Sequence, residues 1–467
     1  MGIYLNPGNQ GFRESVRSEI YVDKTGLIAC TNKKMNTRDK YLCVSRPRRF
    51  GKSMALDMLA AYYSRGCDSA ELFKGFEIEQ AGSFQEHLNR YDVIFLNMQQ
   101  FLIRAKMQEV TEYLETAVIE ELRERYGAFF SERVICLAEA LERIYAKTEK
   151  QFVFLIDEWD CVMRERQESE ELQKQYLDFL RNLLKDQPYV ALAYMTGILP
   201  VKKYGVHSAL NMFTEYSMTD QFDLEEYTGF TEEEVKELCG RYGMDFSETG
   251  NWYDGYRLLR FRHIYNPRSV VEAMRRHRCA SYWTSTETYD ALKTYIDMDF
   301  DGLRTDIVRM LGGERVKVNT RSFQNDMRNF RTKDDVLTLL IHIGYLAYDA
   351  DTEAASILSY NDENSLSCAV GLAYYSARKD YRMVREFPTG RGFADVVFLP
   401  LPHIDRPALV VELKYDKTAQ AAIQQIKDWQ YTQALEGYVG EILLVGINYD
   451  KENKTHECVI ERVEKAG

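Results

Sequence analysis

Short apolar runs alternate with longer helical patterns over residues 41–195, and this alternation restricts the fold more than any other feature of the sequence. The run Phe152–Ile156 is continuously apolar, as expected of a strand buried on both faces of a parallel sheet. Similar runs lie at 41–44, 93–96 and 190–195, with helical patterns at 53–64, 103–125, 131–147 and 171–185. Strands that alternate with helices predict a doubly wound α/β domain, which we place at 1–215.

The pattern changes after residue 216. Thr231 and Glu234 form a capping box, and helical patterns lie at 267–278, 286–297 and 333–342, so 216–335 is predicted to be a mainly helical subdomain. The segment 336–467 is predicted to be a small α/β domain. Its strand patterns lie at 344–349, 356–360, 382–387, 393–399, 408–413 and 441–446, with helical patterns at 363–377 and 417–436.

Length and composition fit a soluble globular protein of two or three domains. The chain has 467 residues, of which 45% are hydrophobic and 28% charged. A net charge of -12 argues against a generally basic nucleic-acid coat, although it leaves room for a local basic groove. No apolar run is long enough for a bilayer, and the nine cysteines include no C-x-x-C pair. We therefore expect a cytoplasmic protein with reduced thiols and no membrane association.

A phosphate-binding loop is predicted where the first strand meets its helix. Gly51-Lys52-Ser53 follows the apolar run 41–44 and opens a helical pattern, which is the context that a P-loop requires. Lys52 would reach the β- and γ-phosphates of ATP, and Ser53 would bind Mg²⁺. Arg46 occupies the position of the first glycine of the usual motif, so this loop must begin its turn differently.

The residues around this tripeptide complete the expected nucleotide site. Arg48, Arg49, Phe50 and Met54 flank it and are predicted to contact the nucleotide. For Arg48 and Arg49 a contact with DNA, with a neighbouring subunit or with solvent alone is an open alternative.

Polar residues also end two later strands. Asp157 and Glu158 follow the apolar run 152–156, where one carboxylate would hold Mg²⁺ and the next would activate the attacking water. Thr196 ends the run 190–195, where a polar side chain would sense the γ-phosphate. Three such signals in chain order predict ATP binding and hydrolysis.

A second group of polar residues lies near the C-terminus. Asp395 lies within one strand pattern, and Glu412 and Lys414 end the next one. Two acids on adjacent strands can share Mg²⁺ or Mn²⁺, and the lysine projects from the same strand face as the second acid. This arrangement is typical of a site that activates water for attack on a phosphodiester.

Several motifs together resemble those of the bacterial AAA-ATPase-like family, over most of residues 1–275. They are Tyr21-Val22-Asp23-Lys24-Thr25, Ser45-Arg46-Pro47-Arg48-Arg49-Phe50-Gly51-Lys52-Ser53, Gly229-Phe230-Thr231-Glu232-Glu233-Glu234-Val235, Trp252-Tyr253-Asp254-Gly255-Tyr256 and Tyr265-Asn266-Pro267-Arg268-Ser269. The resemblance implies a P-loop NTPase fold in which an arginine at position 46 is usual.

Members of this family commonly carry a PD-(D/E)XK nuclease-like domain, with a restriction-endonuclease-like fold, at the C-terminus. The region 344–447 resembles that domain, with Ala394 in place of the proline of the name. The resemblance implies accessory roles for Glu363, Gln425 and Tyr431.

The combined hypothesis is an ATP-dependent switch coupled to a metal-dependent nuclease module that acts on DNA. Three alternatives stay open: an ATP-gated module that grips nucleic acid without cutting it, a P-loop kinase or regulatory NTPase with an unrelated C-terminal domain, and a signalling scaffold that only binds nucleotide. The sequence does not distinguish DNA from RNA, and a homo-oligomer is compatible with it.

Overall fold

The computed structural model forms two compact units. The first consists of Met1–Arg241, Asp254–Val271 and Asn319–Glu353, and the second of Tyr242–Tyr253, Glu272–Val318 and Ala354–Gly467. The structure describes residues 2–105, 110–129, 134, 136–166, 169–201, 210–220, 223–258, 260, 263–280, 282, 302–311, 314–323, 330, 332–357, 380–389, 392–429, 435, 438, 440–450 and 455–463.

A parallel five-stranded sheet organises the first unit. Its strands are β1 Tyr41–Ser45, β2 Asp92–Asn97, β3 Phe152–Asp157, β4 Val190–Gly197 and β5 Thr214–Tyr216, in the order β2-β3-β4-β1-β5. Every neighbouring pair is parallel. The predicted α/β fold with a parallel sheet is therefore confirmed.

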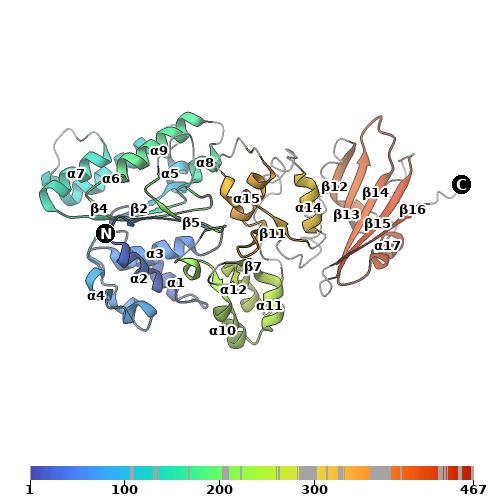
Figure 1. The fold of residues 1–467 in the computed structure, drawn as a ribbon, viewed down its shortest axis with the longest axis horizontal. Helices are drawn as coiled ribbons and strands as arrows, with labels where there is room; N and C mark the ends of the chain where they lie inside the picture. The colour runs from blue at the N-terminus through green and yellow to red at the C-terminus, as the bar shows by residue number, and fades with distance from the viewer. Residues whose placement is uncertain are drawn as a thin grey trace. The chain divides into compact units, whose positions relative to one another are not determined.

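Helices cover both faces of this sheet (Figure 1). One face carries α1 Gln10–Val16, α2 Gly26–Lys34, α3 Lys52–Tyr63 and α4 Phe84–His87, with the 3₁₀ turns η1 Ala70–Leu72 and η2 Glu77–Gln80. The other carries α5 Met98–Arg104, α6 Val110–Tyr126, α7 Leu137–Thr148, α8 Cys161–Glu165 and α9 Glu170–Leu184, with the 3₁₀ turn η3 Gly127–Phe129.

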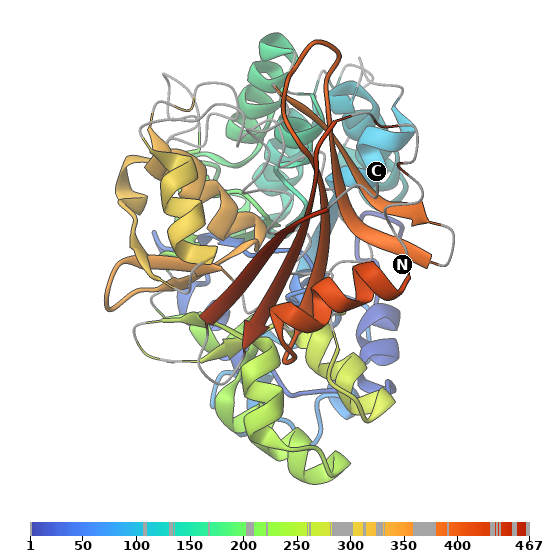
Figure 2. The same cartoon turned by 90° about the vertical axis from the view of Figure 1, so that its right-hand side faces the viewer.

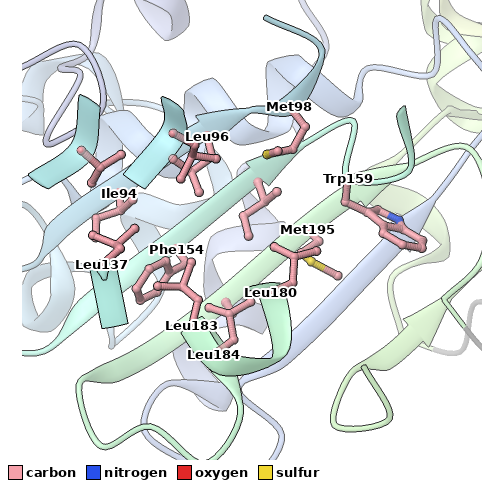
Figure 3. Close-up of a cluster of buried hydrophobic side chains, with 14 of the residues drawn as sticks. Ile94, Leu96, Met98, Leu137, Phe154, Trp159, Leu180, Leu183, Leu184 and Met195 are labelled. Carbon is pink, nitrogen blue, oxygen red and sulfur yellow. The ribbon is translucent and has the colours of Figure 1, made fainter. Parts of the chain in front are cut away.

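Alternate residues of each strand supply the two cores. In β3, Phe154 (Figure 3) and Ile156 join the cluster under α5 to α9, whereas Val153 and Leu155 join the cluster under α1 to α4. Asp157 lies two residues after Leu155 and four after Val153, so its side chain projects from the same face of the strand, which is the side of α3.

The helix predicted at 103–125 was wrong at its start. A separate helix, α5, begins directly after β2, because the Asn97 side chain accepts a hydrogen bond from the Gln100 backbone N–H (3.0 Å) and caps it. α5 ends at Arg104 and α6 begins at Val110. A helix that starts at the last residue of a strand leaves no polar linker for a sequence pattern to detect.

An extended N-terminal segment lies beside β2. Leu5 forms an antiparallel bridge with Ile94, and the Asn6 N–H donates to the Val93 carbonyl (2.7 Å). The carboxylate of Glu121 on α6 accepts from the backbone N–H groups of Ile3, Tyr4 and Leu5 at 2.7–3.0 Å. Three hydrogen bonds to one charged group fix this segment firmly on the first unit.

The remainder of the first unit combines short strands with helices. β6 Phe230–Thr231, β8 Ile264–Tyr265, β7 Asp254–Arg257 and β10 Leu346–Asp349 are neighbours in that order. They accompany α15 Lys333–Ile343, η4 Glu225–Tyr227 and η5 Thr320–Ser322, together with α10 Glu232–Tyr242 up to Arg241 and α12 Pro267–Arg276 up to Val271. The predicted capping box of α10 is present, since Thr231 and Glu234 exchange both hydrogen bonds. The sequence reading missed β6 to β8 because two to four residues are too few to show alternation.

The second unit contains an antiparallel-rich sheet with one helix against it. β12 Tyr381–Thr389, β13 Gly392–Pro400, β14 Ala408–Tyr415, β15 Ile442–Asp450 and β16 Thr455–Arg462 follow in chain order, and only β14 and β15 are parallel. The crossover between those two strands is α17 Ala419–Asp428, which lies across the sheet (Figure 2). The unit also has α11 Phe246–Tyr253, α14 Leu303–Leu311 and the antiparallel pair β9 Val316–Lys317 and β11 Ala354–Ile357.

Two differences from the expected C-terminal pattern stand out. The sequence reading ended at the strand 441–446 and missed β16, in which three consecutive apolar residues, 458–460, lie between charged ones, so no two-residue alternation marks a strand. The helices expected at 286–297 and 363–377 lie outside the described residues. None of the helices within the described ranges is both long enough and apolar enough to cross a bilayer.

Candidate functional site

The loop between β1 and α3 turns through left-handed backbone. Arg49 has a φ of 67° and Gly51 a φ of 83°, and Gly51 is the N-cap of α3. A Cβ added to Gly51 would meet nothing within 4 Å, so the backbone conformation, and not the space, requires glycine there. The loop therefore presents the N-terminus of a twelve-residue helix at the carboxyl edge of the sheet.

Arg46 is a structural tether in this loop. Its side chain is 1% exposed, and its Nη1 donates to the carbonyl oxygens of Ser45 (2.8 Å) and Tyr216 (2.7 Å). Its backbone N–H donates to the Gly197 carbonyl (3.0 Å). Burial lowers the pKa of Arg46 to about 10, which keeps the guanidinium charged at neutral pH. The Arg46 side chain thus joins the ends of β1 and β5, which a glycine has no atoms to do, while its backbone N–H makes the bond to β4.

The Lys52 ammonium lies inside the loop. Its Nζ donates to the carbonyl oxygens of Arg46 (3.1 Å) and Pro47 (2.9 Å), and only 5% of the residue is exposed. Burial lowers the pKa of Lys52, while the carboxylates of Glu158 and Asp157 act in the opposite direction. A buried ammonium held by two neutral carbonyls has a strong electrostatic preference for an anion.

Asp157 connects the end of β3 to two neighbouring elements. Its Oδ2 accepts a hydrogen bond from Ser53 Oγ on α3 (2.7 Å), and its Oδ1 accepts one from Thr196 Oγ1 on β4 (2.6 Å). Asn97 Nδ2, at the end of β2, lies 3.5 Å from Oδ2. The structure thus brings Ser53, Asp157 and Thr196 together at one edge of the sheet, beside the loop that holds Lys52.

These residues fit a magnesium ion in a nucleotide complex. The Ser53 hydroxyl and the Asp157 carboxylate are hard oxygen ligands, and both line a cavity of about 330 Å³. Across the described ranges, no three or more His, Cys, Asp or Glu side chains are grouped to hold a metal by themselves. A magnesium ion at this corner would therefore need phosphate oxygens and waters to complete its coordination.

Glu158 is held by an arginine that the sequence reading missed. Glu158 has a left-handed backbone with a φ of 54°, and its carboxylate pairs with Arg164 Nη2. Arg164 Nε also donates to Asp160 Oδ2 (3.1 Å), which accepts from the backbone N–H groups of Ile198 and Leu199 at 3.1 and 2.8 Å. Burial raises the pKa of Glu158, and the Arg164 charge partly offsets that effect. The i,i+4 spacing of Asp160 and Arg164 was the signal available in the sequence.

The other predicted nucleotide contacts are spread around the loop. The Phe50 ring is buried and packs edge-to-face on Tyr256, with ring centroids 5.7 Å apart. Arg48 is exposed and Arg49 half-exposed, while Met54 on the first turn of α3 is 44% exposed. The surface at the loop and the first turn of α3 therefore carries the side chains of Arg48, Arg49 and Met54. The Phe50 ring is instead buried and holds the loop in place by its contact with Tyr256.

Four residues of the predicted C-terminal site lie close together on β13, β14 and α17. Glu412 Oε1 accepts from Lys414 Nζ (2.9 Å) and from Gln425 Nε2, and Glu412 and Lys414 are buried. Asp395 Oδ2 accepts the Leu413 backbone N–H (2.7 Å). The register Val396↔Val411, continued by one residue, sets Asp395 opposite Glu412. Glu363 and Tyr431 lie outside the described residues.

The N-terminal part of the chain matches a known protein family. Residues 8–207 match the family AAA-ATPase_like, described as "Predicted AAA-ATPase". The match spans the parallel sheet up to β4, including Lys52, Asp157 and Thr196. It stops before β5 and before the residues of the second sheet.

Sequence and structure comparisons give more distant similarities. A protein of Azotobacter chroococcum mcd 1, described as "Uncharacterized protein in vnfD 5'region", is 26% identical over 274 residues, which are 57% of this chain and 51% of the relative. The chain thus spans about half the length of that relative.

Two solved structures align with this chain at low scores. The replication initiator DnaA bound to AMPPCP and single-stranded DNA is 11% identical with a TM-score of 0.29, and the match covers 71% of this chain and 80% of DnaA. The Aeropyrum pernix ORC2 protein in ADPNP-ADP complexes is 11% identical with a TM-score of 0.34, covering 78% and 98%. Scores of this size carry no functional conclusion.

Replacing Arg46 by the glycine of the usual motif should lower the stability of the folded protein. Arg46→Gly removes the donor to two buried carbonyls, so we expect the free energy of unfolding to fall by about 3 kcal/mol in a urea titration. Arg48→Gly, in the same loop but exposed, controls for the added backbone freedom and should cost about 1 kcal/mol. Equal losses for the two variants would show that the buried guanidinium contributes nothing.

Proposed function

We propose that the first unit binds ATP with Mg²⁺ and hydrolyses it to ADP and phosphate. The observation that carries this proposal is the contact of Ser53 Oγ with Asp157 Oδ2 at 2.7 Å, beside the buried ammonium of Lys52. These groups come from α3 and β3 and meet at the carboxyl ends of parallel strands, where ligands of such sheets bind. The match of residues 8–207 to the Predicted AAA-ATPase family supports the proposal.

Each residue has a distinct part in binding. Backbone N–H groups at the start of α3 and the Lys52 ammonium bind the phosphates, which replace the Arg46 and Pro47 carbonyls as partners of Nζ. Ser53 and Asp157 hold Mg²⁺, which supplies charge neutralisation for the phosphoryl group when bound. Thr196 keeps the Asp157 carboxylate oriented through its 2.6 Å hydrogen bond.

Glu158 acts as the general base. A water oxygen forms a bond to the γ-phosphorus while the bond from that phosphorus to the β–γ bridging oxygen breaks, and the water proton passes to the Glu158 carboxylate. ADP leaves with the bridging oxygen. For this step the carboxylate must leave its ion pair with Arg164, because a paired carboxylate is a weaker base.

The second candidate function is metal-dependent cleavage of DNA by the second unit. It is favoured by the contact of Glu412 Oε1 with Lys414 and Gln425 and by the position of Asp395 in the neighbouring strand. Asp395 and Glu412 would share Mg²⁺ or Mn²⁺ through carboxylate oxygens, and the ion would polarise the phosphodiester and acidify a bound water. The Lys414 ammonium would hold that water or the phosphate. An inactive nuclease fold that only grips nucleic acid is the competing reading.

ATP binding and turnover should separate in two variants. Lys52→Ala is expected to weaken ATP binding about 100-fold, because it removes the buried cation that pairs with phosphate. Glu158→Gln should keep ATP affinity and lower turnover by about 100-fold or more, because it removes the base. Calorimetric binding and a phosphate-release assay measure the two effects.

Lys40→Ala, at the opposite end of β1, is the matched control and should behave as wild type. Normal ATP affinity in Lys52→Ala would refute the nucleotide site. Tight ATP binding without any turnover in the wild type would favour a nucleotide-binding regulator over an ATPase.

The pH dependence of turnover should report Glu158. The base works when ionised, so turnover is retained above its folded-state pKa and lost as pH falls through that raised value. Arg164→Met removes the cation that offsets the rise, so the acid limb of the pH–rate profile should move to higher pH. Arg181→Met, which breaks an exposed pair with Asp178 on α9, should leave the limb in place. An unmoved limb in Arg164→Met would mean that another group titrates.

Nuclease activity should depend on the Asp395 and Lys414 side chains of the second unit. Asp395→Ala and Lys414→Met are each expected to abolish cleavage of DNA in Mg²⁺ or Mn²⁺, measured on supercoiled and linear substrates by gel. Lys427→Ala, an exposed lysine on α17 that pairs with Glu461, is the control and should cleave normally. DNA binding without cleavage by the wild type in either metal would favour the inactive fold.

A further inference from the structure

The cavity beside the proposed metal ligands extends along α3, away from the phosphate loop. It measures about 330 Å³, and its polar lining includes Ser53, Asp57, Asn97, Gln100, Arg104 and Asp157. The proposed function uses only Ser53 and Asp157 of this set, which leaves the rest of the cavity without a role. The carboxylate of Asp57 is the feature that most needs an explanation.

Asp57 lies one helical turn after Ser53 on the same face of α3. Residues four positions apart on a helix have Cβ atoms about 5–6 Å apart, so both side chains reach the same cavity. The Asp57 carboxylate lies against α1, where a Cβ on Gly11 would come within 2.6 Å of its Cγ. The glycine on α1 therefore provides the space that the carboxylate occupies.

No hydrogen-bond donor or cation within the described ranges pairs with the Asp57 carboxylate, although the residue is only partly exposed. Burial and the negative charges of Asp157 and Glu14 raise the pKa of Asp57 to about 6. Arg104 lines the same cavity, but its Nη1 donates to the Tyr4 hydroxyl (3.0 Å). A half-buried carboxylate close to a second carboxylate is unfavourable unless a cation or its waters lie between them.

We propose that Asp57 is an outer ligand of the metal, which accepts a hydrogen bond from a water bound to the Mg²⁺ at Ser53 and Asp157. This inference rests on the proposed function and adds a residue to the same site. Mg²⁺ keeps several waters when it binds proteins and nucleotides, and those waters are strong hydrogen-bond donors. A metal–water distance of about 2.1 Å plus a hydrogen bond of about 2.7 Å approximates the spacing of side chains one turn apart.

The test is Mn²⁺ affinity of the full chain in the presence of a non-hydrolysable ATP analogue, measured by electron paramagnetic resonance of the free ion. Asp57→Asn should weaken Mn²⁺ binding about 10-fold or more, as loss of an outer-shell acceptor does. Affinity for the ATP analogue without metal should stay at the wild-type value. Glu14→Gln removes a nearby charge that does not line the cavity, so it should leave Mn²⁺ affinity within about 2-fold of wild type.

Folding is checked on the same samples. The raised pKa means that ionised Asp57 destabilises the folded protein above pH 6, so Asp57→Asn should have an unchanged or higher melting temperature at pH 7.5 without metal. A lower melting temperature would overturn the inference, because it would make Asp57 a stabilising group of the metal-free fold.

Ser53→Ala distinguishes failure of this inference from failure of the proposed function. Weakened Mn²⁺ binding in Ser53→Ala with wild-type binding in Asp57→Asn would overturn the outer-ligand role alone. Unchanged Mn²⁺ binding in both variants would remove the metal from this corner and would overturn the proposed site as well.

Discussion

The Asp157 carboxylate is the interaction on which the candidate site depends. It receives hydroxyl hydrogen bonds from α3 and β4 while it ends β3, so three elements meet at one buried acid. Such an arrangement is possible only because the strands are parallel and their carboxyl ends share one edge. The cost of burying this charge is offset by the two short hydrogen bonds, and a divalent cation would offset it further.

Sequence reasoning was reliable where a pattern was long or locally decisive. The apolar run of β3, the strand–turn–helix around Gly51 and the capping box at Thr231 each combine several signals within a few residues. It also selected Ser53, Asp157 and Thr196, because strand ends are visible in sequence and parallel strands bring their ends together. Two-residue strands such as β6 and β8 carry no such signal, and they form only because neighbouring strands pair with them.

The parts of the site that could not be predicted from the sequence depend on contacts between residues that are far apart in the chain. Nothing near Arg46 in the chain indicates that its guanidinium reaches the Tyr216 carbonyl on β5, yet that bond explains why an arginine replaces glycine in this loop. The i,i+4 spacing of Asp160 and Arg164 is visible in the sequence, but the pairing of Arg164 with Glu158 is not, because a contact between residues six apart depends on the left-handed turn at Glu158. Asp57 was overlooked because its surroundings come from α1 and from the ends of β2 and β3.

The N-terminal segment that runs beside β2 has a consequence for how this protein can associate. An uncovered outer strand offers free N–H and C=O groups to any extended chain, which is a common route to aggregation. Residues 4–6 occupy that side of β2, and Glu121 keeps their backbone in place. At the opposite margin the sheet ends in β5, a strand of only three residues. A strand of a second molecule therefore cannot pair with β2, because residues 4–6 already do so. At the other margin it would find only the three residues of β5 to pair with.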